Sequence, residues 1–220
     1  AITSVAGTTS YQILHPVPFT YFSSWSSRGD WIALTGIDPS ACNSYEIRPD
    51  GSRIPAHGNA SWSRLFITKT DGSDQRYVGN ASLDELSLFT ETSWSPDETK
   101  LAFPYYDQGT TGMGVADLET GHVLRLTRDG GTYPRWSPRG DWIAFIDAGN
   151  IDLMHPDGSG ERIIPTGGSA EAISWNPQGS RLAFSSRDTI GIIDADGTNL
   201  TPFSEVRPGP ISWSPDGKTI

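Results

Sequence analysis

The sequence predicts an all-β protein with the architecture of a β-propeller, built from four-stranded antiparallel blades. The first observation is a motif in which a Trp precedes a short polar turn, and Ile or Leu follows seven residues after the Trp. The second is an Asp-Gly or Thr-Gly turn between two apolar runs, which follows four copies of the motif. Two hairpins in about 40 residues are typical of one propeller blade. The motif begins at Trp25, Trp94, Trp136, Trp175 and Trp213.

Each copy of the Trp motif predicts a hairpin between the first and second strands of a blade. In Ser214-Pro215-Asp216-Gly217, Pro presets φ, Asp can bond its own backbone and Gly accepts a positive φ. The Ile-Ala-Phe type of run that follows has a small Ala between two bulky residues, which suits a strand buried on both faces. The Asp-Gly turns predict the hairpin between the third and fourth strands. Since each Trp has the same place before its turn, we expect all five to be structural anchors.

The order of these signals divides residues 1–220 into four complete blades with half a blade at each end, in a single propeller domain. Residues 1–14 align with the third and fourth strands of the fourth blade, with Gly7 on Gly197. The first strand of a further blade is expected at Pro210–Trp213. Two interpretations stay open. Either the ends meet and close a five-bladed ring, or the domain is incomplete at its C-terminus and belongs to a propeller of six or more blades.

The first complete blade is longer than the others. The distance from Trp25 to Gly72 is 47 residues, whereas the corresponding distance in the third and fourth blades is 22. The surplus predicts an insertion at 36–61, in the loop between the second and third strands. Because Tyr45–Gly51 itself has the pattern of a strand and its turn, two degenerate blades within 25–94 are the alternative.

These motifs resemble the repeat of the TolB-like β-propellers. The residues that carry the resemblance are WSPDGKTI at 213–220 and IDLMHPDGSGERII at 151–164, and matching motifs cover nearly the whole chain. The resemblance implies a non-catalytic scaffold that binds a protein or peptide in the periplasm, at the cell surface or outside the cell. Related propellers cover the hydrolase domain of prolyl-oligopeptidase-type serine peptidases, so a domain of a larger peptidase is one alternative. A structural unit of an extracellular assembly is another.

Composition narrows the class of partner. The net charge of −10 argues against nucleic acid, whose phosphates need clustered Lys and Arg. No apolar run approaches the roughly 20 residues of a membrane-spanning helix, so no membrane insertion is expected. Cys42 is the single cysteine, which excludes an internal disulfide but not export. The sequons at Asn59, Asn80 and Asn199 are consistent with an extracellular surface.

Catalytic, metal and cofactor motifs are missing from the sequence. Gly167–Glu171 lacks the last Gly of a nucleophile elbow. The four His residues do not have the spacing of metal ligands, and the isolated Asp-Gly turns do not form a calcium loop. We therefore expect no enzyme activity, unless a hydrolase domain lies outside this chain, and neither metal nor cofactor.

The candidate binding residues follow from the layout of a blade. The hairpin turns lie on one face of a propeller, here called the turn face, and the remaining loops lie on the opposite face, here called the loop face. Variable loops on a rigid scaffold usually carry function, and Tyr and Arg are common anchors of protein interfaces. The candidates expected on the loop face are Tyr45, Arg48, Tyr105, Tyr106, Asp107, Tyr133, Arg135, Glu171, Arg187 and Arg207.

Overall fold

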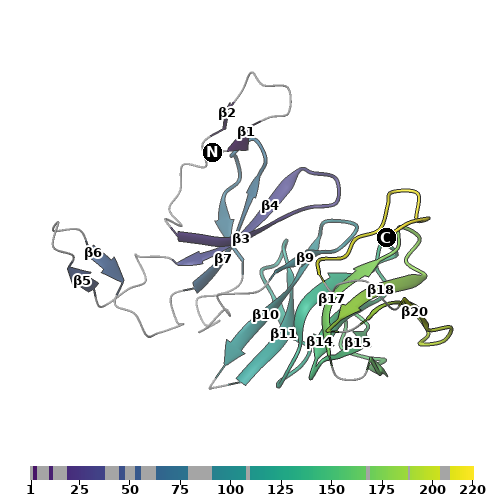
Figure 1. Ribbon diagram of the computed structural model, residues 1–220. Coiled ribbons are helices and arrows are strands. Elements are labelled where there is room, and N and C mark those ends of the chain that lie inside the picture. Colours follow the sequence, from purple (N-terminus) through teal and green to yellow (C-terminus); the bar gives the residue numbers. More distant parts are fainter. Residues whose placement is uncertain are drawn as a thin grey trace.

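The computed structural model describes residues 2–3, 10–11, 19–37, 45–47, 53–55, 63–78, 91–107, 110–166, 169–187, 189–203 and 209–220. Every regular element among these residues is a β-strand (Figure 1). The strands include four four-stranded antiparallel sheets, and in each of them the strands pair in chain order. The all-β fold with four complete propeller blades is therefore confirmed.

The four blades follow one another along the chain. The first contains β3 (Phe19–Trp25), β4 (Trp31–Ile37), β7 (Ser63–Lys69) and β8 (Arg76–Tyr77). The second contains β9 (Ser93–Trp94), β10 (Lys100–Asp107), β11 (Thr110–Asp117) and β12 (Val123–Arg125). The third contains β13 (Thr132–Trp136), β14 (Ile143–Asp147), β15 (Asn150–Met154) and β16 (Arg162–Ile164). The fourth contains β17 (Ala170–Trp175), β18 (Arg181–Ser186), β19 (Ile190–Asp194) and β20 (Thr201–Phe203). The first strands β3, β9, β13 and β17 contact one another from blade to blade, as innermost strands do.

Two short hairpins accompany the blades. At the N-terminus β1 (Ile2–Thr3) pairs with β2 (Ser10–Tyr11), where the sequence places the third and fourth strands of a blade. Within the expected insertion β5 (Tyr45–Ile47) pairs with β6 (Arg53–Pro55). Since β4 pairs directly with β7 and extends to Ile37, the first two residues of 36–61 belong to a blade strand. That the remainder is an insertion stays a prediction.

The polar residue after each Trp explains why the turn motif repeats. Except in the third blade, its side-chain oxygen accepts a hydrogen bond from the backbone N–H five residues later, as Ser95 does from Lys100 and Asn176 from Arg181, both at 2.9 Å. In the third blade Ser137 Oγ instead donates to Asp141 Oδ1 and accepts from Arg139 N. Each hairpin then needs a left-handed residue. Gly29, Gly140, Gly179 and Gly217 have positive φ there, and in the second blade Glu98 adopts φ +63° instead. At the C-terminus this turn forms between Ser214 and Thr219, but the expected strand at Pro210–Trp213 is absent.

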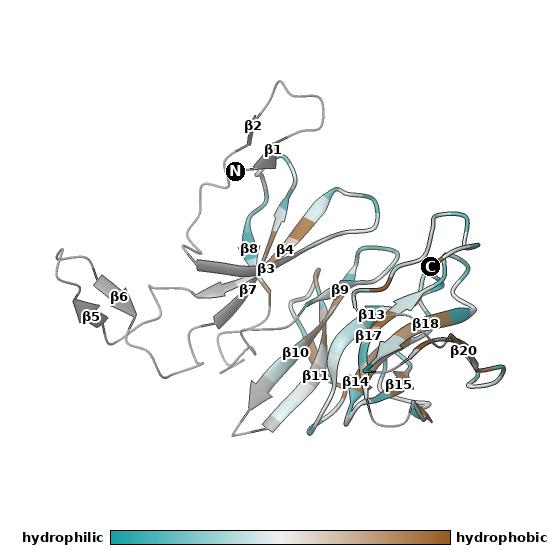
Figure 2. Cartoon of the chain, in the orientation of Figure 1, coloured by the Kyte–Doolittle hydropathy of each residue, from teal (hydrophilic) through white to brown (hydrophobic). Residues whose placement is uncertain are grey.

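The hydrophobic core lies between neighbouring blades. Figure 2 shows hydrophobic residues along the middle strands of the blades and hydrophilic residues at the turns. One buried cluster joins the third and fourth blades, and it includes the fully buried Leu153 and Leu182. A second cluster joins the first and second blades, and a third joins the second and third blades. Burial on both faces of each sheet is why the sequence shows Ile-Ala-Phe runs rather than alternation.

The repeated Trp residues differ in burial. Trp94, Trp136 and Trp175 are buried, and Trp213 is half-buried. Trp25 is 55% exposed, so it does not share the buried position of these residues, and its role as a structural anchor stays a prediction. The later Trp side chains pack against the blade that precedes them, and no blade of the described residues precedes the first one.

Candidate functional site

Three candidate residues lie at the surface on the loop face: Tyr133, Glu171 and Arg187. Tyr133 belongs to β13 and Glu171 to β17, and these first strands of adjacent blades contact each other. At both residues the pairing with the second strand is interrupted by a bulge, which changes the direction of the side chain. Arg187 directly follows Ser186, whose Cα partner in β17 is Ala170. We call these three residues the loop-face patch.

The loop that leads to Tyr133 is held in one conformation. Thr127 Oγ1 accepts a hydrogen bond from Met113 N and donates one to Gly130 O, both at 2.8 Å. Gly131 has φ +94°, and a Cβ there would lie 3.2 Å from Met113 Cβ, so only glycine fits. Tyr133 itself has φ +53°, a conformation that is rare for a bulky residue and costs about 1–3 kcal/mol. The side chain of Tyr133 is thus presented from a fixed, strained backbone.

Tyr105 is a core residue rather than a loop residue. It lies within β10, is 3% exposed, and its hydroxyl donates to Thr127 O. Gly112 on β11 leaves room for the Tyr105 ring, because a Cβ at Gly112 would lie 2.6 Å from Tyr105 Cζ. Tyr105 lies in the core because β10 is unusually long and continues to Asp107, where a loop was expected. Tyr105 therefore supports the loop before Tyr133 and does not belong to a binding surface.

Arg135 joins two blades. Its guanidinium pairs with the carboxylate of Glu91 in the segment before β9, and the side chain is 30% exposed. Arg135 is already paired, so we do not include it in the loop-face patch. Arg48 and Arg207 lie outside the described residues, and of Tyr45, Tyr106 and Asp107 only the backbone is described.

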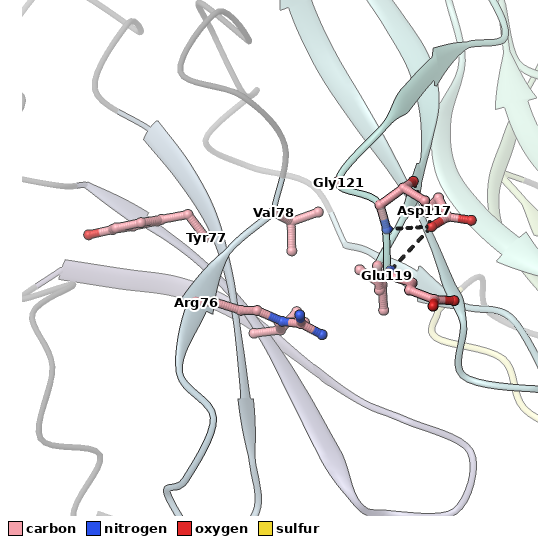
Figure 3. A pocket seen from close by; sticks show the side chains of 9 residues that line it. Arg76, Tyr77, Val78, Asp117, Glu119 and Gly121 are labelled. Atoms are coloured by element: carbon pink, nitrogen blue, oxygen red, sulfur yellow. Dashed lines mark hydrogen bonds between the residues drawn. The ribbon is translucent and has the colours of Figure 1, made fainter.

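Three cavities among the described residues lie between neighbouring blades on the turn face. The cavity between the first and second blades has a volume of about 180 Å³. Figure 3 shows Arg76 reaching from β8 toward the turn of Asp117, Glu119 and Gly121, while Tyr77 points away from it. The cavity between the second and third blades measures about 300 Å³, and the one between the third and fourth about 410 Å³. Sequence reasoning missed these cavities, because each forms where two successive blades meet and no single repeat contains it.

The aspartates of the turn face are mostly engaged in the turns. Asp71, Asp157 and Asp196 each accept a backbone and a hydroxyl hydrogen bond from the residue two positions later. These hydrogen bonds hold the pKa of the three carboxyls below the ordinary value. The regular turns thus fulfil the structural role that the sequence predicts for them.

Asp152 departs from the repeat and was not a candidate. It is 4% exposed, and its Oδ1 has no hydrogen-bond partner. Burial, together with the charges of Asp147 and Glu161, raises its pKa to about 6. Asp152 on the third strand of its blade is the Cα partner of Phe145 on the second strand. At the equivalent position of the fourth blade, the partner of Phe184 is Gly191. The sequence does contain a signal for Asp152. It is an Asp at the position opposite the aromatic residue of the second strand, where another blade has Gly.

Neither metal ligation nor a transmembrane helix is seen in the described part of the chain. No group of three or more His, Cys, Asp or Glu side chains there is arranged to hold a metal ion. No helix there is long and apolar enough to span a bilayer.

Comparison with known proteins supports the propeller fold. No protein-family model and no curated protein matches the sequence. A protein assigned as TolB in Agrobacterium tumefaciens is similar with a TM-score of 0.58 and 21% identity, over 90% of this chain and 87% of that one. TolB from Acinetobacter baumannii has a TM-score of 0.65 and 16% identity, over 98% of this chain and 51% of that one. Hydrazine synthase from Kuenenia stuttgartiensis has a TM-score of 0.57 and 16% identity, over 89% and 78%. At these identities the likeness establishes a TolB-like β-propeller fold and nothing finer.

Proposed function

We propose that the chain is a non-catalytic scaffold of the TolB-like propeller type, which binds a protein or peptide through its loop-face patch. The observation that carries the proposal is the strained backbone of Tyr133, which presents an exposed aromatic side chain from a loop fixed by Thr127. Backbone strain in a bulky residue is retained where the surroundings enforce it, and such residues cluster at functional sites. Preorganisation also lowers the entropic cost of binding.

The chemistry of the patch fits a protein partner. It combines an aromatic ring, a guanidinium and a carboxylate within the ends of β17, β18 and the neighbouring β13. Tyr and Arg are enriched among the residues that dominate interface energies. We further propose that the partner is met in the periplasm or at the cell surface, in keeping with the TolB-like fold.

Capture experiments with the full chain as bait test this function. Partners are captured from an envelope extract, identified and purified, and their affinity is measured directly. The double change Tyr133→Ala and Arg187→Ala should weaken binding by about 2 kcal/mol or more. Asp157→Asn on the turn face should leave binding unchanged, since Asn-Gly suits the same turn as Asp-Gly. If Asp157→Asn abolished binding while the double variant bound normally, the functional face would be the opposite one.

A further inference from the structure

We propose that the cavity between the third and fourth blades binds a small zwitterion, a free amino acid or a short peptide that carries both a carboxylate and an ammonium group. This site goes beyond the proposed function, because it lies on the turn face and takes a small molecule. The cavity has a volume of about 410 Å³, which is within the range of small-molecule sites. The charged residues that line it are Arg139, Asp141 and Arg162 of the third blade, and Asp194 and Asp196 of the fourth.

The two arginines cross the blade boundary and end on adjoining turns. Arg139 donates through Nε to Gln178 O at 2.8 Å. Arg162 donates through Nη1 to Ala195 O at 3.1 Å. Because Ala195 N in turn donates to Ser180 O at 2.9 Å, the two turns of the fourth blade that hold these side chains are joined to each other. Both guanidiniums are therefore held against the same wall of the cavity.

Both guanidiniums keep donors for a ligand. A guanidinium has five N–H donors, and within the described part of the chain each of these two donates to a single carbonyl oxygen. No ion pair among the described residues includes Arg139 or Arg162. Arg162 is also fixed in place, since its Cζ lies 5.1 Å from the ring centre of Trp142. Donors held in this way can take a carboxylate, which they match in geometry.

The boundary between the first and second blades supplies a carboxylate of its own. The turns of the first and third blades both contain the sequence Arg-Gly-Asp-Trp, so Arg28 corresponds to Arg139. Glu98 of the second blade accepts a hydrogen bond from the backbone N–H of Arg28. The fourth blade has Gly179 in place of Glu98, and a Cβ there would lie 3.0 Å from Arg139 Cγ. Gly179 thus replaces an internal carboxylate by space for the Arg139 side chain, whose guanidinium is left for an external one.

Three aspartates line the same cavity and determine the rest of the ligand. Asp141, Asp194 and Asp196 each accept hydrogen bonds from their own turn through one oxygen, and the second oxygen has no partner among the described residues. Two positive and three negative charges therefore face the cavity. An anion without a cationic group meets the surplus of carboxylates, and a simple cation meets the arginines. A zwitterion satisfies both, with its carboxylate on the arginines and its ammonium on the free carboxylate oxygens.

Titration of the ¹⁵N-labelled full chain followed by NMR tests the site. The probe is the dipeptide Ala-Ala. Its C-terminal amide lacks the negative charge, and its N-acetyl form lacks the positive charge. Trp142 lines the cavity, and its indole N–H signal is the one that disappears in Trp142→Phe. We expect this signal to shift in a saturable manner with the dipeptide, and each blocked form to bind about tenfold more weakly or worse.

Arginine variants test the residues. Arg139→Gln and Arg162→Gln should each weaken binding of the dipeptide about tenfold or more. The matched control is the double change Arg28→Gln and Arg76→Gln, which removes the corresponding arginines from the boundary between the first and second blades and should leave binding unchanged. Thermal melts establish that each variant is folded.

Free alanine distinguishes the two sources. Binding of alanine as tight as that of Ala-Ala indicates an amino acid, and tighter binding of Ala-Ala indicates a peptide; either result supports a zwitterion site. If Trp142→Phe does not fold, the backbone amide of Gly179 reports binding instead. Equal binding of Ala-Ala and either blocked form, or unchanged affinity in either arginine variant, would overturn the proposal. So would the absence of a saturable shift with both ligands, which is the result expected of arginines that only join the blades.

Discussion

Replacing Asp152 by Asn should remove a pH dependence from the stability of the fold. Asp152 is 4% exposed, and its Oδ1 has no hydrogen-bond partner. Its Cα partners are Phe145 on β14 and Ile163 on β16. Side chains of paired residues lie on the same face of a sheet, and Phe145 packs in the cluster between the second and third blades. The carboxyl group therefore faces this blade interface, where ionisation is costly.

The magnitude follows from its pKa, which burial, together with Asp147 and Glu161, raises from 3.8 to about 6. Below 3.8 the carboxyl is protonated in both the folded and the unfolded chain, and it has no effect on their difference. Between 3.8 and 6 the unfolded chain ionises first, so folding stability decreases as the pH rises. Above 6 both states are ionised and the loss is complete. A difference of about two in pKa corresponds to about 3 kcal/mol.

Urea denaturation of the wild type and of Asp152→Asn, each at pH 4.5 and pH 7.5, measures this effect. The stability of the wild type relative to the variant should fall by about 2–3 kcal/mol between the two pH values. Comparing differences removes the constant cost of burying the Asn amide. Glu171→Gln deletes an exposed carboxylate and serves as the matched control. A wild type and variant that differ by the same free energy at both pH values would refute the reasoning.

Three further predictions concern the repeat. Trp175→Ala should destabilise the fold by about 3–5 kcal/mol in denaturant melts, whereas Trp25→Ala should cost less than about half as much, since Trp25 is 55% exposed; equal costs would contradict the difference in burial. Glu98→Gly should raise the free energy of unfolding by about 1 kcal/mol, because Glu98 has φ +63° where the other blades use Gly. A loss of stability would show that the hydrogen bond from Arg28 N to Glu98 Oε1 contributes more to stability than the backbone strain costs. Deleting 40–60 with a short Gly-Ser bridge should keep the β-sheet circular dichroism signal, since β4 and β7 pair without it; collapse of the signal would favour a blade strand at Tyr45–Ile47.

The sequence alone predicts the features of the fold that are determined within a single repeat. The Trp motifs and Asp-Gly turns are local, so the four blades and their order could be read from spacing. Tyr105 was misplaced because strand length varies between blades, although Gly112 and Gly114 on the facing strand indicate room for a ring there. The exposure of Trp25 depends on a neighbouring blade, and the cavities depend on two blades meeting. No pattern within a single repeat contains that information.

Departures from the repeat are where function is best sought in this protein. A residue that the repeat requires is explained by the fold, as Ser95 is by its bond to Lys100. Tyr133, Trp136 and Asp152 are not explained in this way. Tyr133 has a strained backbone, Trp136 has an unpaired donor, and Asp152 has a buried, unpaired carboxylate. All three belong to the third blade, where Ser137 also bonds differently from Asn176 in the corresponding turn of the fourth blade. The fourth blade has one comparable group, the buried and unpaired Ser185 Oγ. Because three such features lie in the third blade, that blade is where a binding role is best sought.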